Sequence, residues 1–190
     1  MTQQRPARFP PLRREAMTPE QREAADAIVA GPRGGLRGPF NAWLRSPVLA
    51  DRLQRVGEYL RFHSSLPRRL NELAILITAR AWSAQFEWYA HHAMAMDAGL
   101  DPAIAADIAE GRRPAGMSED ESVVFEFCTQ LRRDRNVGDA TFQAAVEAFG
   151  EQGVIDLIAV CGYYDIVSMT LNVAEVALPE GVPAPLRPLS

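Results

Sequence analysis

Lysine is absent from this 190-residue chain, and all 20 of its basic residues are arginine. No side-chain amine is therefore available to form a Schiff base with a carbonyl substrate or with pyridoxal phosphate. Long blocks of like charge are also missing, and the 20 basic residues stand against 24 acidic ones, for a net charge of -4. A block of positive charge is what usually binds a phosphate backbone, so we expect no nucleic-acid partner.

Cysteine is scarce, with only Cys128 and Cys161, which lie far apart in the sequence. They form neither a zinc knuckle nor a CxxC redox pair. Each lies in apolar surroundings on a different predicted helix, so we expect buried, reduced thiols without a neighbouring resolving thiol. No HxxxH or ExxH pair occurs either, and the side chains of adjacent His91 and His92 diverge on a helix, so we predict no metal site.

A long uninterrupted apolar run is missing as well. The most apolar stretch, residues 154–178, contains Asp156, Asp165, Asn172 and Glu175, which would be costly in lipid. We therefore expect a core helix and no membrane span. The first 17 residues have arginines and prolines but no apolar h-region, which argues against a secretory signal and favours a cytoplasmic protein.

Helical periodicity runs from residue 18 nearly to the end, whereas strand-like alternation never lasts more than a few residues. The sequence therefore predicts an all-α helical bundle of roughly seven to nine helices. We expect one domain over residues 17–178, with a flexible arm at 1–16 and a proline-rich tail at 179–190. The two ends are expected to be disordered or to lie on a partner.

Capping signals locate several helices. Thr18 and Gln21 form a capping box around Pro19, and this predicts a helix that closes on Gly31. The following stretch, GPRGGLRGPFNAW, is rich in glycine and proline and predicts a loop that could edge a pocket. A short turn is expected near residues 40–44.

Two further helices are predicted to start at Pro47 and Pro67. Periodicity after Pro67 continues to Gly99, which is long for a globular helix, so we place a break near Ser83 and expect Ser83 to be an N-cap.

The C-terminal part combines a helical segment at 139–149 with a following segment that is apolar on nearly every face. Such a helix must be enclosed by its own bundle or by a second subunit, and 190 residues make a thin bundle. We therefore predict a homo-oligomer, which could be a dimer, a trimer or a hexamer.

The stretch AWSAQFEWYAHH, residues 81–92, concentrates four aromatic rings, a carboxylate and two of the three histidines. On a helix, Glu87 and His91 are four residues apart and share a face. A carboxylate at this position raises the histidine's pKa and orients its ring, which suits a proton donor near neutral pH. His92 points about 100 degrees away, so only one of the two histidines can face a given cavity, and we favour His91. The alternative is that the rings are core and the pair is a structural contact.

The longer stretch RRLNELAILITARAWSAQFEWYAHHAMAMDAGL resembles the signature region of the carboxymuconolactone decarboxylase family, which is related to the alkylhydroperoxidase D proteins. The similarity covers roughly residues 35–180, including GPFNAWLRSPVLADRLQRVGEYLRF and AVCGYYDIVSMTLNVAEVALP. In the peroxidase branch a glutamate precedes CxxC, and a histidine follows four positions after the second cysteine. Glu72 falls on that glutamate, Ala84 and Glu87 fall on the cysteines, and His91 falls on the histidine.

This resemblance implies the alkylhydroperoxidase D-like helical fold without the redox cysteines, so thiol peroxidase chemistry is not expected. The namesake reaction, part of aromatic catabolism, removes carbon dioxide from a carboxylated unsaturated lactone and requires no cofactor. We expect His91 to donate the proton, Glu87 or Glu72 to orient it, and Arg80 to bind a substrate carboxylate. The other residues expected at the substrate are Trp82, Trp88, His92, Tyr163 and Tyr164.

Two other functions remain open. The chain could be a peroxiredoxin-like antioxidant protein of the peroxidase branch that has lost its redox cysteines. It could also be a non-catalytic assembly or small-ligand binding protein whose histidine and glutamate hold helices together. In the latter case Glu72 could simply pair with Arg68 or Arg69, one turn back on its own helix. The expected partners are a small carboxylic acid or lactone and further copies of the chain.

Overall fold

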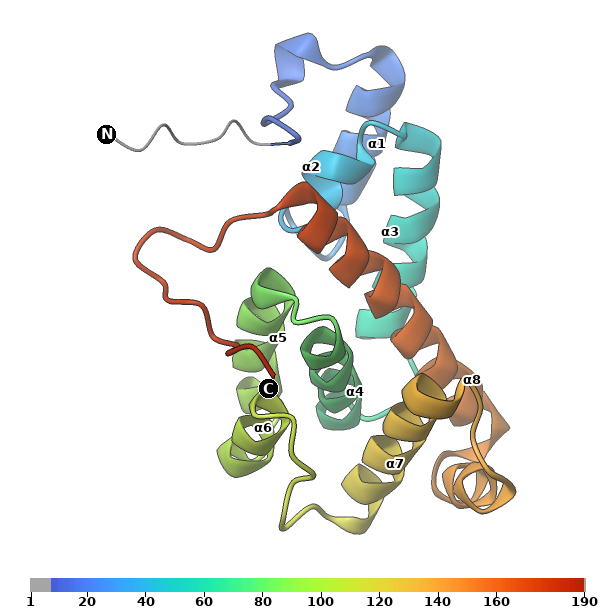
Figure 1. Ribbon diagram of the computed structural model, residues 1–190. Helices are drawn as coiled ribbons and strands as arrows, with labels where there is room; N and C mark the ends of the chain where they lie inside the picture. Colours follow the sequence, from blue (N-terminus) through green and yellow to red (C-terminus); the bar gives the residue numbers. More distant parts are fainter. Residues whose placement is uncertain (1–7, 190) are drawn as a thin grey trace.

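The structure, a computed structural model that describes residues 8–189, is all-α (Figure 1). These residues form eight α-helices, a 3₁₀ turn at Arg14–Ala16 and no strand. The all-α prediction is therefore confirmed, and the number of helices lies in the predicted range. The helices are α1 (Pro19–Ala30), α2 (Phe40–Trp43), α3 (Pro47–Phe62), α4 (Arg68–Ala81), α5 (Gln85–Asp97), α6 (Pro102–Ala109), α7 (Glu119–Asp134) and α8 (Asp139–Ala174).

Helix α4 is the central element of the bundle and packs against α5, α6, α7 and α8 (Figure 1). Every residue from 70 to 80 is buried, so its polar side chains need partners inside the protein. The Asn71 side chain donates to the Leu60 carbonyl at 2.8 Å, and the Thr78 hydroxyl donates to the Ala74 carbonyl at 2.9 Å. Glu72 is also on this buried stretch, so its carboxylate lies in the protein interior and needs a partner there.

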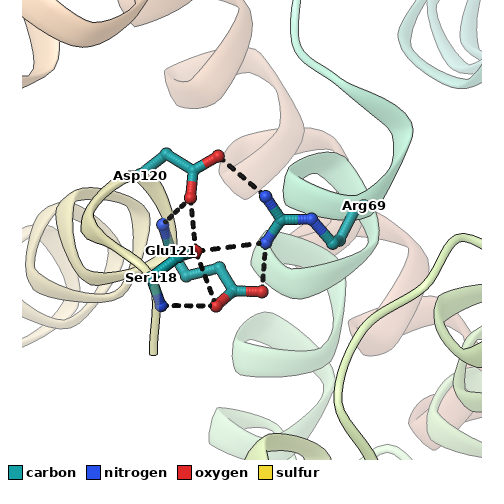
Figure 2. Close-up of polar contacts among 4 residues, drawn as sticks. All are labelled: Arg69, Ser118, Asp120 and Glu121. Carbon is teal, nitrogen blue, oxygen red and sulfur yellow. Dashed lines mark hydrogen bonds and ion pairs between the residues drawn. The ribbon is translucent and has the colours of Figure 1, made fainter. Parts of the chain in front are cut away.

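A cluster of charged side chains joins α4 to the start of α7 (Figure 2). Arg69 pairs with Asp120 at 2.8 Å and also with Glu121, whose carboxylate accepts from the backbone N–H of Ser118 at 2.8 Å. Acidic groups at a helix N-terminus are favourable because they face the positive end of the helix dipole. Since Arg69 is engaged with α7, it is not the partner of Glu72.

The predicted break between α4 and α5 is confirmed, but the assignment of Ser83 as an N-cap is wrong. Ser83 has φ 48°, and the N-cap of α5 is Ala84, which makes no side-chain capping bond. The backbone N–H of Ser83 donates to Arg80 and that of Ala84 donates to Ala79, both at 2.9 Å. Ser83 thus terminates α4 in a left-handed conformation, and the tight turn returns α5 along the side of α4.

Helix α8 contains a sharp break at Gly150, whose φ of 68° and ψ of 173° are accessible mainly to glycine. The predicted separation into two segments is confirmed. The chain's own bundle does not enclose this helix, because Ile155 is 64% exposed and Val173 is 57% exposed, and enclosure by a second subunit stays a prediction. Among residues 8–189, α8 is the one helix long and apolar enough to cross a membrane, although 56% of its most apolar window is buried within the chain.

Both ends of the described chain lie on the bundle. The Asn41 side chain bonds to the backbone of Phe9 and Leu12, each at 2.9 Å. At the other end, Gln85 makes two hydrogen bonds with the backbone of Leu186, at 2.8 and 3.0 Å. The described parts of the arm and of the tail therefore contact the bundle of their own chain. Residues 1–7 and 190 lie outside the described part.

Candidate active site

His91 lies between two carboxylates in the interior. Its Nδ1 donates to Glu72 Oε2 at 2.7 Å, and its Nε2 is 3.2 Å from Glu87 Oε1. All three side chains are buried, with 4–5% of each residue exposed. The contact with Glu87 is the predicted contact one turn apart on α5, and the contact with Glu72 results from the return of α5 along α4.

The two carboxylates keep His91 protonated. Burial alone would lower the pKa of the imidazole, but the charges of Glu72 and Glu87 and their hydrogen bonding outweigh this and raise the pKa from 6.5 to about 9. At neutral pH the ring is therefore an imidazolium that carries a proton on each nitrogen. It is an abundant proton donor, although a weaker acid than an ordinary histidine.

A cavity of about 390 Å³ opens beside this group, within the range that suits a small ligand. Its walls come from the loop at 33–40, from α3, from α5 and from α8. His91 and Glu87 line the cavity, whereas Glu72 lies behind the ring. Nδ1 is held by Glu72 behind the ring, so Nε2, which is paired with the cavity-lining Glu87, is the nitrogen nearer to a ligand in the cavity.

Three arginines that the sequence analysis did not single out, Arg33, Arg37 and Arg61, also line this cavity. The Arg33 guanidinium lies over the Phe40 ring, 5.4 Å from its centroid, and its Nε and Nη2 have no hydrogen-bond partner among residues 8–189. The Arg33 side chain is half-buried beside the Tyr163 hydroxyl, and its positive charge at the cavity wall favours an anionic ligand. The signal in the sequence was the glycine-rich loop with its arginines, which was expected only to edge a pocket.

Tyr163 and Tyr164 line the same cavity, as expected for residues at the substrate. The ring of Tyr164 meets His91 edge to face, with centroids 5.0 Å apart. Burial raises the pKa of Tyr163 to about 12 and that of Tyr164 well above 10, so both hydroxyls stay protonated and can donate. On α3, a Cβ at Gly57 would lie 2.1 Å from the Tyr163 hydroxyl and 2.3 Å from Arg33 Nη2, so only glycine allows this approach.

Four residues expected at the substrate lie elsewhere. His92 and Trp88 occupy the other side of α5, with ring centroids 6.2 Å apart, and face a shallow pocket against α6. Trp82 is 38% exposed and its indole donates to Asp165. Arg80 lines a separate cavity. For His92 the reason is helical geometry, because neighbouring residues on a helix diverge by about 100 degrees and His91 faces the cavity.

The two thiols need a correction. Cys128 and Cys161 are free and buried as expected, but their sulfurs are 3.5 Å apart, so each has a neighbouring thiol after all. The packing of α7 against α8 brings them together, and nothing in their sequence spacing indicated this. The hydrogen bond with Cys161 and burial raise the pKa of the Cys128 thiol well above its ordinary value, which suppresses its thiolate.

Within residues 8–189, no group of three or more His, Cys, Asp or Glu side chains is arranged to hold a metal ion. Glu72 and Glu87 contact opposite nitrogens of the His91 ring, so the three groups do not converge on one point.

The fold and the site together describe an all-α protein with a histidine held by two carboxylates at a cavity lined by arginines. No protein-family model, curated protein or solved structure matches this chain.

Proposed function

We propose that the chain is a cofactor-independent decarboxylase, or a related lyase or isomerase, that acts in the cytoplasm on a small carboxylated lactone, with His91 as general acid. The observation that carries the proposal is the protonated His91 between Glu72 and Glu87 at the wall of the cavity. The resemblance of residues 68–100 to the carboxymuconolactone decarboxylase family supports the same assignment, and it also suggests the alkylhydroperoxidase D-like type of bundle.

The reaction needs only groups that the cavity supplies. Arg33 and Arg61 hold carboxylates of the substrate through charge-assisted hydrogen bonds. The bond to the departing carboxylate breaks, and its electron pair moves through the conjugated ring to the lactone carbonyl. The hydroxyls of Tyr163 or Tyr164 donate to the resulting oxyanion. His91 Nε2 then gives its proton to the ring carbon, carbon dioxide leaves, and solvent restores the proton.

The direct test is a screen of carboxylated lactones for carbon dioxide release, with Arg33→Met beside the unaltered protein. Because Arg33 binds carboxylate before and during the reaction, we expect its loss to raise KM by roughly tenfold or more with a smaller effect on kcat. Arg113→Met, which removes an exposed arginine away from the cavity, is the matched control. Tight binding of the acids without any turnover would instead favour the non-catalytic binding protein.

A thiol-based antioxidant activity is the second candidate, because Cys128 and Cys161 lie close enough to react with each other. Against it stands the burial of both sulfurs, since the hydrogen bond between them raises the pKa of Cys128 but lowers that of Cys161. We expect no peroxide consumption above background in an assay driven by dithiothreitol. Turnover that disappears in Cys161→Ser would establish this second function and remove the first.

We also propose that the chain is a homo-oligomer in which a second copy covers the exposed stripe of α8. The stripe contains Ile155, Ile158, Ile166, Met169 and Val173, spaced by three, four or eight residues along one face. Large apolar side chains exposed along one face of a helix are typical of subunit interfaces.

Light scattering is expected to give a multiple of 21.0 kDa. Ile158→Glu should shift the mass toward the monomer, because it places a charge in the apolar contact. Val29→Glu, on α1 and away from the stripe, should not. A monomer for the unaltered chain would contradict the proposal.

A further inference from the structure

A second cavity, of about 360 Å³, lies between α4, α6 and α7 and shares no lining residue with the His91 cavity. Its apolar wall is formed by Ile77, Ile108 and Phe125. Its charged lining consists of Arg80, Arg112, Arg132 and Arg133. No acidic side chain lines it. An apolar wall beside several guanidinium groups suits a ligand with one negative end and one apolar end.

Arg80 differs from the other three arginines. Arg112 pairs with Asp107, Arg132 with Asp165 and Arg133 with Asp134, at 2.6–2.7 Å. Arg80 is 4% exposed and forms no ion pair within residues 8–189. The acidic residue whose charge acts on it, Glu110, is not in ion-pair contact. A buried cation without a counter-ion lowers the stability of the fold, and a bound anion would remove that penalty.

The unpaired nitrogen atoms of Arg80 indicate which edge of its guanidinium an anion would contact. Its Nη1 donates to the carbonyl of Arg187 at 3.0 Å, while Nε and Nη2 have no partner in the described chain. Nε and Nη2 form the side edge of the guanidinium, whose two parallel N–H bonds match the two oxygens of a carboxylate.

We propose that this second cavity binds a small monocarboxylic acid with an aromatic or aliphatic body. The carboxylate lies against the Nε and Nη2 edge of Arg80, and the body packs on Ile77, Ile108 and Phe125. This site is separate from the proposed reaction at His91 and does not depend on it.

The C-terminal tail lies at the rim of the site, where the chain end approaches α5 and α6 (Figure 1). Arg187 accepts from Arg80, and the Leu189 side chain lies 2.8 Å from where a Cβ on Gly111 would stand. Nε and Nη2 are almost fully covered in this arrangement. Entry of the acid therefore requires a shift of residues 187–189 or of the Arg80 side chain, and binding is expected to be slower than diffusion.

The test is calorimetric titration of the full chain with benzoate and with hexanoate, using benzamide and hexanamide as uncharged analogues. We expect the acids to bind and the amides to bind at least tenfold more weakly, because they lack the charge that Arg80 pairs with. The relative affinities of the two acids distinguish an aromatic from an aliphatic ligand. Absence of measurable binding by both acids at millimolar concentration would overturn the proposal.

Variants locate the bound acid. Arg80→Met should weaken binding at least tenfold, Arg80→Lys should weaken it less, and Arg52→Met, which removes an exposed arginine on α3, should leave it unchanged. Thermal melts of the free variants show whether each is folded, and the Nε–H resonance of Arg80 should shift on titration of the unaltered chain. His91→Ala and Arg33→Met should bind these acids normally. Loss of binding in Arg33→Met with full binding in Arg80→Lys would place the acid in the His91 cavity and refute the second site.

Discussion

Replacing His91 with alanine is expected to lower kcat for carbon dioxide release by about 10²–10⁴, the usual contribution of a positioned acid. The imidazolium lies at the cavity wall as the proposed proton donor, and Glu72 holds it in place through Nδ1. The measurement is single-turnover carbon dioxide release with a lactone acid identified by the screen.

The pH dependence gives this prediction a second readout. Because the pKa of His91 is raised to about 9, the donor form persists through neutral pH, and the rate of the unaltered protein should fall as the pH rises through that value. The residual rate of His91→Ala should lack this decline. His92→Ala is the matched control, since His92 belongs to the same helix but lies outside the cavity. An unchanged rate in His91→Ala would remove this residue from the mechanism.

Replacing Glu72 with leucine is expected to lower the free energy of unfolding by about 1–3 kcal/mol, because His91 Nδ1 loses its buried acceptor while Glu87 still pairs with the ring. The rise in the His91 pKa from 6.5 to about 9 corresponds to a net stabilisation of roughly 3 kcal/mol, which is what remains of the interaction with both carboxylates after the cost of burying the ring. Urea denaturation at pH 6 measures the loss.

Two comparisons separate the loss of the Glu72–His91 ion pair from poor packing of the new leucine side chain. The double variant Glu72→Leu with His91→Leu leaves the buried Glu87 carboxylate without its cation, so it should be less stable than Glu72→Leu alone. The folded-state pKa of His91 exceeds its unfolded value, so its stabilisation is complete below about pH 6.5 and is lost as the pH rises through about 9. The deficit of Glu72→Leu should therefore shrink above pH 9. A deficit that is constant with pH would show that the ion pair contributes nothing.

The local parts of the fold could be predicted from sequence because their causes are local. Thr18 and Gln21 form the capping box that starts α1, and Gly150 takes a conformation that separates the two parts of α8. The pairing of Glu87 with His91 also follows from helical spacing within α5. Ser83 is the instructive error, because a serine near a helix boundary satisfies the pattern of an N-cap and of a helix end equally well.

Contacts between distant segments could not be predicted in the same way. Arg33 reaches the His91 cavity because Gly57, on another helix, leaves room for its guanidinium. Cys128 and Cys161 meet because α7 packs on α8. Arg80 was expected at the substrate from its nearness in sequence to the cluster, yet it lines a separate cavity that shares no lining residue with the His91 cavity. Spacing along one helix carries no information about such partners.

The sequence by itself determined the all-α class, most of the helix boundaries and the shared face of Glu87 and His91, because caps and periodicity act over a few residues. Tertiary structure alone decided that Glu72 completes the pair, that arginines and tyrosines surround it, and that α8 leaves an apolar face uncovered. The reason is physical: burial and charge pairing depend on which helices pack together, and that packing is a property of the whole chain.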